Sequence, residues 1–235
     1  MSGPAAAIVV AGGSGERFGR AEGKQLALVA GHPVLSWSLR SLDACGLEVI
    51  VVVCHPDRMD EYRAQAVEPL GMATTVVFAR GGETRQDSVA SGLAALPDGI
   101  DIVVVHDGAR PLLRPELATG ALAMLRATEN ADGVIVGHPS VDTLKLVDKG
   151  RVVETADRSR VWAVQTPQVF RASALRDAHE SARRDGFVAT DDSALVERYG
   201  GVVMVFEGPR DNIKITVPED HAFVEAALLR REKEE

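Results

Sequence analysis

A glycine-rich segment with two cationic residues follows the first apolar run of the chain. Residues 11–15 are Ala, Gly, Gly, Ser and Gly, and Arg17 and Lys24 come after them. Glycines let a backbone approach a ligand and point its N–H groups at phosphate oxygens. The spacing matches neither the dinucleotide fingerprint GxGxxG nor the P-loop GxxxxGK[ST]. An ordinary tight turn would not explain so long a stretch ending in two cations, so we predict a phosphate-binding loop.

A carboxylate comes at the end of another apolar run. Residues 106–111 are His, Asp, Gly, Ala, Arg and Pro, and they directly follow the run 102–105. Open α/β sheets bind ligands at the carboxyl ends of their parallel strands. Mg²⁺ prefers one or two carboxylates together with phosphate oxygens. Asp107 is therefore the candidate metal ligand, the alternative being a turn or capping acid, and His106 is expected to be packed rather than catalytic.

A third polar segment, residues 81–88, follows an apolar run and begins a predicted helix. A helix N-terminus preceded by a glycine pair can bind ligand oxygens or base edges. The ordinary alternative is a capped helix start with Thr84 as the N-cap and Asp87 at the third helical position. Two further cationic residues, Arg158 and Lys214, do not indicate a role by themselves. Lys214 lies in a strand-like run, where it is either an exposed edge residue or a phosphate ligand.

Short apolar, β-branched runs alternate with amphipathic stretches along most of the chain, which predicts parallel strands joined by helices in a doubly wound, mostly parallel α/β sheet. The predicted strands are residues 6–10, 49–53, 75–78, 102–105, 134–136 and 202–206. The predicted helices are residues 34–44, 58–67, 87–96, 116–128, 173–184, 192–199 and 219–231.

Residues 139–167 interrupt this alternation. Residues 141–147 alternate apolar with polar, Asp148-Lys149-Gly150 is typical of a turn, and residues 151–154 resume the pattern. This predicts a β-hairpin. An excursion of this size is too small for a domain, so we expect residues 1–235 to form a single domain. The hairpin is either an edge insertion or an arm that reaches a second subunit.

The composition limits the classes of molecule that the protein is expected to bind. The net charge of −8 disfavours nucleic acid and a membrane surface as partners, so any anion site must be a local cluster of cations. No stretch approaches the roughly 20 apolar residues of a membrane span. Cys45 and Cys54 form no disulfide framework, and the N-terminus lacks the basic region of a signal peptide, so a cytoplasmic protein is expected.

Taken together, these segments resemble the sugar-nucleotidyltransferase superfamily and, within it, the 2-C-methyl-D-erythritol 4-phosphate cytidylyltransferase family. The resemblance extends from residue 6 to the last predicted helix. The order and content of its motifs make it specific. They are residues 11–25, 81–88, 106–111, 141–145, 165–168, 190–192 and 211–214.

The resemblance implies a Rossmann-like nucleotidyltransferase fold and a reaction. CTP and 2-C-methyl-D-erythritol 4-phosphate would give 4-diphosphocytidyl-2-C-methyl-D-erythritol and pyrophosphate with Mg²⁺, in the non-mevalonate isoprenoid pathway. The nucleophile, a phosphate monoester with a second pKa of ~6, is mostly ionised near pH 7. Hence no general base is needed, and catalysis should consist of positioning and charge neutralisation.

The resemblance also implies roles for individual residues. Arg17, Lys24, Arg158 and Lys214 would be catalytic, with Arg17 and Lys24 on the α-phosphate and the leaving pyrophosphate. The nucleotide would contact Ala11, Gly12, Gly13, Ser14, Gly15, Gly82, Glu83, Arg85, Ser88, Asp107 and Gly108, with Asp107 beside the metal. The sugar phosphate would contact Arg110, Thr143, Arg158, Thr190 and Lys214. Thr143 and Arg158 would come from the partner's arm, which implies a homodimer.

Two rival interpretations remain. A ribitol 5-phosphate cytidylyltransferase would share the CTP-binding segments, but Lys145 and the run 211–214 favour methylerythritol phosphate. A non-catalytic nucleotide-binding module on the same fold would be expected to lack Arg17, Lys24 or Asp107, and all three are present.

Overall fold

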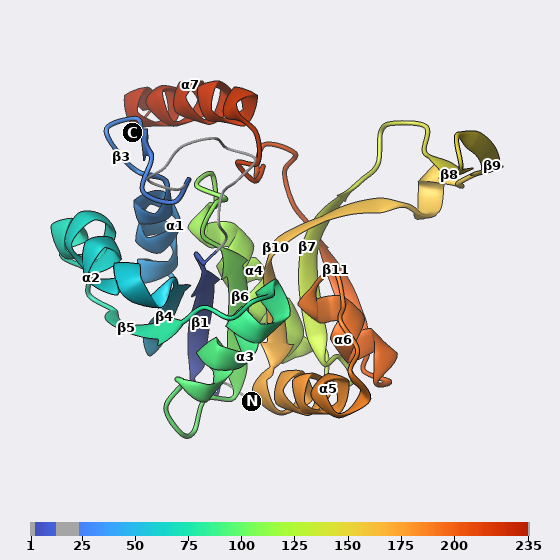
Figure 1. The fold of residues 1–235 in the computed structure, drawn as a ribbon, viewed down its shortest axis with the longest axis horizontal. Coiled ribbons are helices and arrows are strands. Elements are labelled where there is room, and N and C mark those ends of the chain that lie inside the picture. The colour runs from blue at the N-terminus through green and yellow to red at the C-terminus, as the bar shows by residue number, and fades with distance from the viewer. Residues whose placement is uncertain (1–2, 13–23, 235) are drawn as a thin grey trace.

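The computed structural model describes residues 3–12 and 24–234. Within them the chain forms a seven-stranded sheet of order β11-β7-β10-β6-β1-β4-β5 with helices on both faces (Figure 1). Neighbouring strands are parallel except β10, which is antiparallel to both β6 and β7. The strands are β1 (Ala5–Val10), β4 (Val49–Cys54), β5 (Thr75–Arg80), β6 (Ile102–Asp107), β7 (Gly133–Pro139), β10 (Trp162–Arg171) and β11 (Val203–Glu207).

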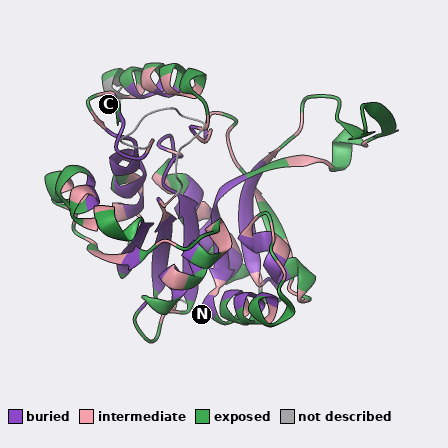
Figure 2. Cartoon of the chain, in the orientation of Figure 1, coloured by how far each residue is buried: buried purple, intermediate pink, exposed green. Residues whose placement is uncertain are grey.

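The central strands are apolar because helices cover both of their faces. In β1, Ala7 and Val9 pack into one hydrophobic cluster while Ala6 and Ile8 pack into the other. The first cluster includes α1 (Val34–Asp43) and α4 (Pro115–Ala127). The second includes α3 (Arg85–Ala94), α5 (Ala172–Asp185) and α6 (Asp192–Arg198). The predicted doubly wound, mostly parallel sheet is confirmed, and Figure 2 shows its strands as the most buried part of the molecule.

One predicted helix differs from the structure, and one strand of the structure was not predicted. The helix predicted over 58–67 is divided into η2 (Pro56–Arg58), α2 (Met59–Tyr62) and the π-helical η3 (Arg63–Val67), followed by η4 (Glu68–Leu70). Pro69 in η4 has no N–H with which to extend a helix. The antiparallel strand β10 was not expected, because the polar residues 165–168 interrupt its apolar pattern.

A short hairpin and the last helix cover one end of the sheet. β2 (Leu28–Val29) pairs with β3 (His32–Pro33), and α7 (Pro218–Glu234) lies across the end toward which the parallel strands point (Figure 1). Ile215 and Val224 join the two in a third hydrophobic cluster. None of the helices in the described part of the chain is long and apolar enough to cross a membrane.

The predicted β-hairpin is present and extends away from the body of the molecule (Figure 1). β8 (Lys145–Asp148) pairs with β9 (Arg151–Thr155) across Lys149 and Gly150, whose φ angles are 47° and 82°. Positive φ at both central residues suits the right-handed twist of a hairpin. Because Pro139 pairs with Trp162 in the main sheet, the segment beyond the sheet, which we call the arm, is residues 140–161.

Candidate active site

The predicted site segments meet at the carboxyl ends of the parallel strands. Asp107 is the last residue of β6, while Gly12 and Gly82 each follow their strands, β1 and β5, by two residues. Backbone hydrogen bonds from Ala11 N to Val53 O and from Gly81 N to Cys54 O, both 2.7 Å, hold these strand ends together. Three polar segments far apart in the sequence therefore face one region, as the rule for open α/β sheets predicts.

A cavity of about 350 Å³ opens at this end of the sheet. It brings together many of the predicted nucleotide and catalytic residues. Its walls are Val10, Gly12, Lys24, Gln25, Gly82, Glu83, Thr84, Arg85, Ser88, Asp107, Ala109 and Lys214. Ala11 and Gly108 adjoin it, because Ala11 precedes Gly12 and Gly108 N donates to Val10 O at 3.0 Å. We call it the nucleotide cavity, after the residues in its walls that are predicted to contact a nucleotide. Gly13, Ser14, Gly15 and Arg17 lie outside the described residues.

A smaller cavity of about 180 Å³ lies beside the first. It contains Arg110 and Thr190, two of the residues predicted to contact the sugar phosphate, together with Gln165, Gln168 and Asp191. Arg85, Asp107 and Lys214 line both cavities, so they form a shared wall. A larger hollow of about 540 Å³ lies between α3 and α5, but none of the predicted site residues lines it.

Three cationic side chains from the described residues surround Asp107. Lys214 Nζ lies 2.8 Å from Asp107 Oδ2, Arg85 Nε lies 3.1 Å from Oδ1, and Arg110 Nε lies 3.8 Å from Oδ2. Burial opposes ionisation of this carboxyl, but the charges of Arg85 and Lys214 outweigh it and hold the pKa of Asp107 well below its ordinary value. Asp107 is therefore an ionised carboxylate, as a metal ligand requires.

His106 is packed, as expected. It is fully buried, and its Nδ1 lies 3.1 Å from Thr166 Oγ1, which also accepts the Asp107 N–H at 3.0 Å. Burial lowers the pKa of His106 to about 3, so the ring is neutral near pH 7. A neutral buried ring that contacts Thr166 acts through packing and hydrogen bonding to the strand end.

The start of α3 confirms the capped-helix interpretation of two residues. Thr84 Oγ1 accepts from Asp87 N, and Asp87 Oδ2 accepts from Thr84 N, which makes a capping box. Gly82 N donates to Ser88 Oγ at 3.1 Å. A Cβ on Gly82 would lie 2.3 Å from Asp87 Cβ, so this approach requires glycine. The capping box leaves Glu83 exposed at the edge of the nucleotide cavity.

Lys214 lies in a loop rather than in a strand, contrary to the strand-like pattern of its run. Ile215 N donates to Ala109 O at 2.8 Å, and Lys24 Nζ donates to Ile215 O at 3.2 Å. Arg110 donates to Asn212 O at 2.8 Å. These hydrogen bonds fix the loop against the end of β6, and Lys214 consequently reaches Asp107.

The segment 165–168 contributes to the site, although residues 165–167 fall within the predicted arm, residues 139–167. Gln168 Nε2 donates to Asp191 Oδ2 at 2.7 Å, and Asn212 Nδ2 donates to Thr166 O at 2.9 Å. Two buried atoms of the smaller cavity, Arg110 Nε and Gln168 Oε1, have no hydrogen-bond partner within residues 3–12 and 24–234. A charged donor beside an amide acceptor suits a ligand that carries both hydroxyl groups and phosphate.

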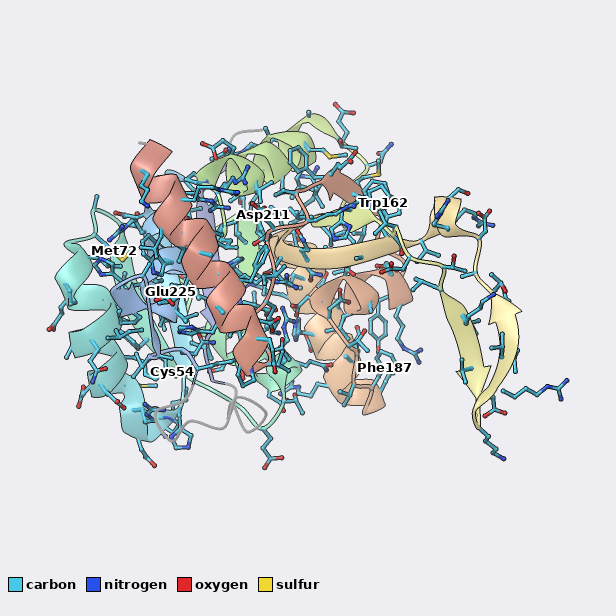
Figure 3. All side chains as sticks on the ribbon, turned by 90° about the horizontal axis from the view of Figure 1, so that it is seen from above. Cys54, Met72, Trp162, Phe187, Asp211 and Glu225 are labelled. Atoms are coloured by element: carbon cyan, nitrogen blue, oxygen red, sulfur yellow. The ribbon has the colours of Figure 1, made fainter. Side chains whose placement is uncertain are left out.

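Thr143 and Arg158 are not in either cavity. Both are exposed on the arm, and Arg158 donates to Val141 O at 3.3 Å. Figure 3 shows Trp162 where the arm leaves the body, and Trp162 is the first residue of β10. Within one chain the structure therefore separates these two predicted sugar-phosphate residues from Arg110, Thr190 and Lys214.

The donors at the shared wall fit a particular kind of metal site. Within the described residues no cluster of three or more His, Cys, Asp or Glu side chains could hold a metal ion. Mg²⁺ bound mainly through phosphate oxygens needs only one or two protein carboxylates. Asp107, which is ionised and faces the nucleotide cavity, fits such a site, whereas a metal held by protein ligands alone would not fit.

Comparisons with known proteins agree on one family. The model of the 2-C-methyl-D-erythritol 4-phosphate cytidylyltransferase family matches residues 5–230. The protein of that name from Microcystis aeruginosa is 40% identical over 226 residues, covering 95% of this chain and 98% of the relative. That from Geobacillus thermodenitrificans is 42% identical over 233 residues, covering 96% and 97%.

Solved structures agree with this family. The 4-diphosphocytidyl-2C-methyl-D-erythritol synthase of Anaerococcus prevotii superposes with a TM-score of 0.85 at 30% identity, covering 97% of this chain and 99% of that one. The 2-C-methyl-D-erythritol 4-phosphate cytidylyltransferase of Thermus thermophilus superposes with a TM-score of 0.73 at 30% identity, covering 94% and 97%.

Proposed function

Because this chain belongs to the 2-C-methyl-D-erythritol 4-phosphate cytidylyltransferase family, and is thus a nucleotidyltransferase, we propose that the two cavities bind the two substrates of one transfer. CTP occupies the nucleotide cavity and methylerythritol phosphate the smaller one. The phosphate of the sugar attacks the α-phosphate of CTP, and pyrophosphate leaves. The observation that carries this proposal is the shared wall of Arg85, Asp107 and Lys214 between the cavities.

The main obstacle to this reaction is electrostatic, because both reactants are anions. A cation about 4 Å from a phosphate gains about 4 kcal/mol at an effective dielectric constant of 20, before desolvation is counted. Lys24 and Lys214 line the nucleotide cavity and Arg110 lines the smaller one. In the proposal Lys24, with Arg17, neutralises the α-phosphate and the leaving pyrophosphate. Arg110, Thr190 and Lys214 hold the sugar phosphate in line for attack.

Mg²⁺ is the proposed cofactor, with Asp107 as its protein ligand. When bound, the ion would neutralise charge on the triphosphate and help orient it. Arg85 and Lys214 already keep the Asp107 carboxylate ionised, so no proton has to leave before a metal binds. Gly82, Glu83 and Ser88 would then face the cytosine and the ribose from the start of α3.

The arm is proposed to join two copies of the chain. Leu146, Val147, Val152 and Val153 on the hairpin are each more than half exposed, which is an unusual concentration of apolar surface for a hairpin in water. In a homodimer the arm would carry Thr143 and Arg158 to the smaller cavity of the partner.

Cys45 and Cys54 are both free thiols, which supports a reducing compartment such as the cytoplasm.

The proposed reaction predicts a strict substrate requirement. Purified protein with CTP and Mg²⁺ should release pyrophosphate only when 2-C-methyl-D-erythritol 4-phosphate is added, because the attacking phosphate comes from that substrate. A coupled pyrophosphate assay measures this. Ribitol 5-phosphate is the comparison substrate, and faster release with it than with methylerythritol phosphate would show that the substrate assignment is wrong.

The arm proposal predicts a selective change in KM. Arg158→Ala should raise the KM for methylerythritol phosphate by about tenfold or more while changing the KM for CTP much less, because a charge-assisted contact to the sugar phosphate alone is lost. Steady-state kinetics with each substrate varied in turn measures both values. Arg151→Ala, at another exposed arginine of the hairpin, is the matched control.

Mixed dimers test where Arg158 acts. In a dimer of one Arg158→Ala subunit and one Lys24→Ala subunit, a shared site predicts one intact active site, which combines Lys24 of the first subunit with the arm of the second. At a methylerythritol phosphate concentration well below the wild-type KM, where both parent variants are strongly impaired, the mixed dimer should therefore show up to about half of the activity of a wild-type dimer. No recovery in a mixed dimer of verified composition would place Arg158 outside the partner's site.

A further inference from the structure

Arg85 joins two buried carboxylates. Its Nε lies 3.1 Å from Asp107 Oδ1 in the shared wall, and its terminal nitrogen Nη1 lies 2.5 Å from Asp192 Oδ2. Asp192 is the first residue of α6, and its side chain is 1% exposed. One guanidinium group thus divides its donors between a carboxylate that faces the substrates and a carboxylate that does not line either substrate cavity.

The second oxygen of Asp192 has a different partner. His179 Nε2, on α5, lies 3.0 Å from Asp192 Oδ1, and the His179 side chain is 6% exposed. An ionised carboxylate only accepts hydrogen bonds, so His179 Nε2 carries the hydrogen. Burial disfavours the charged form of Asp192, but the hydrogen bond from His179 and the charge of Arg85 lower the pKa of its carboxyl below the ordinary value. Asp192 is therefore ionised with both oxygens satisfied.

The position of Asp192 is fixed by its neighbours along the chain. Gln86 of α3 donates to Phe187 O at 3.0 Å and accepts from Ala189 N at 3.0 Å. Gln168 of β10 holds Asp191. These contacts anchor the chain just before Asp192, so we expect the longer Arg85 side chain to be the member that moves if the balance of hydrogen bonds changes.

These contacts make the two carboxylates competitors for Arg85. Arginine binds a carboxylate most strongly through two parallel N–H···O bonds to both of its oxygens. His179 donates to Asp192 Oδ1 and Arg85 to Oδ2, so both oxygens have a donor while Arg85 Nε stays on Asp107. Without the His179 donor, a buried oxygen would lack a partner, which is costly, and Arg85 would rotate to satisfy both oxygens of Asp192.

We propose that His179 is a positioning residue for the nucleotide site: by binding one oxygen of Asp192 it keeps the Arg85 guanidinium on Asp107, in the wall that faces CTP. The inference rests on the proposed function for the identity of the nucleotide. His179 itself lines neither substrate cavity and lies on the wall of the hollow between α3 and α5. Its effect on catalysis would therefore pass through Asp192 and Arg85.

Two substitutions separate this role from simple packing. His179→Leu keeps similar bulk but removes the donor, and we expect it to raise the KM for CTP about tenfold, a typical effect of losing an outer hydrogen-bond partner. We expect kcat to change much less. His179→Gln restores an N–H donor and should return the KM to within about twofold of the wild-type value. Equal KM values for all three proteins, or equal defects in both variants, would overturn the proposal.

A control substitution on α5 separates a loss of stability from a loss of the proposed positioning role. Leu175 is also fully buried on α5 but packs only in the hydrophobic cluster on that face of the sheet. Leu175→Val should lower the thermal unfolding temperature and leave the KM for CTP unchanged at a temperature where the protein is folded. If Leu175→Val raises this KM as much as His179→Leu does, the effect is general loosening of α5 and the positioning role is wrong.

Two readouts keep the inference independent of turnover. Calorimetric titration with CTP and Mg²⁺ should show about tenfold weaker binding to His179→Leu than to the wild type. A crystal structure of His179→Leu should show Arg85 with two hydrogen bonds to Asp192 and none to Asp107. An Arg85 that stays on Asp107 overturns the inference. A wild-type protein that releases no pyrophosphate with methylerythritol phosphate overturns the proposed function, and the position of Arg85 in the crystal structure of His179→Leu then still decides the role of His179.

Discussion

Asp107→Asn is expected to lower kcat about a thousandfold while leaving a folded protein. The amide has the same shape as the carboxylate but cannot neutralise Arg85, Lys214 and Arg110, which all lie within 4 Å of Asp107. It is also a poor ligand for the Mg²⁺ that we propose at this position. Loss of one preorganised electrostatic contact at a reacting group costs about 10²- to 10³-fold, and this change removes a metal ligand as well. Steady-state kinetics with Mg²⁺ varied would measure both the loss and the higher metal concentration required.

The same substitution should change how stability depends on pH. The pKa of Asp107 is lower in the folded protein than the ~3.9 expected when unfolded. Its ionised form therefore contributes stability that is fully present above about pH 4 and is lost as the pH falls below that value. Thermal unfolding between about pH 5 and 2.5 should show a shallower decline for Asp107→Asn than for the wild type. Asp57→Asn, whose carboxylate is 87% exposed, is the control and should leave the slope unchanged. Equal slopes for all three proteins would contradict the ion-pair account of Asp107.

Lys24→Ala is expected to lower kcat by about 10²- to 10³-fold with a smaller effect on the KM for either substrate. Lys24 lines the nucleotide cavity together with Asp107 and Lys214, and its ammonium group would meet negative charge that develops on the leaving pyrophosphate. A contact that strengthens in the transition state affects kcat more than substrate binding. Rapid-quench measurement of a single turnover would report the chemical step directly.

The controls for Lys24→Ala test whether the variant is folded and whether the charge at this position matters. Lys24 Nζ also donates to Ile215 O, so the circular dichroism and unfolding temperature of Lys24→Ala must be compared with those of the wild type. Lys24→Arg keeps a cation at this position and should retain more activity than Lys24→Ala. Lys149→Ala, on the exposed turn of the hairpin, should have wild-type kcat. An unchanged kcat in a folded Lys24→Ala protein would remove Lys24 from the transition state.

The parallel core was predictable because its strands are marked twice. Each is a short, nearly continuous apolar run, and each is separated from the next by an amphipathic stretch. The strand β4, VIVVVC, has no polar residue that could face water, which predicts burial on both faces. The hairpin was predictable from Asp148-Lys149-Gly150, where a left-handed turn needs glycine. The strand β10 was not predictable, because the run Gln165-Thr166-Pro167-Gln168 interrupts its apolar pattern. The polar side chains of this run make contacts in the site, such as that of Gln168 with Asp191.

The places of several candidate site residues in the fold were predictable, but the contacts among them were not. The spacing of Asp107 behind an apolar strand predicted its place at a strand end, and the capping pattern predicted Thr84 and Asp87. By contrast, the pairs Arg85–Asp192 and Lys214–Asp107 each span 107 residues. Local patterns carry no information on which distant charges will pair, so the role of His179 required coordinates.

The course of β10 has a mechanical consequence. The strand begins at the base of the arm, where Trp162 pairs with Pro139, and four residues later, roughly 13 Å along an extended chain, it reaches Thr166. Pairing with β7 is interrupted near this point, and there Asn212 holds Thr166 by its carbonyl while Asp107 donates to its hydroxyl. The base of the arm and Thr166, which accepts the Asp107 N–H, are thus two points on one short strand. Because only a few residues separate the base of the arm from Thr166, a movement of the arm base would be transmitted to Thr166. Contacts between the arm and a second chain would therefore also affect how rigidly Asp107 is held.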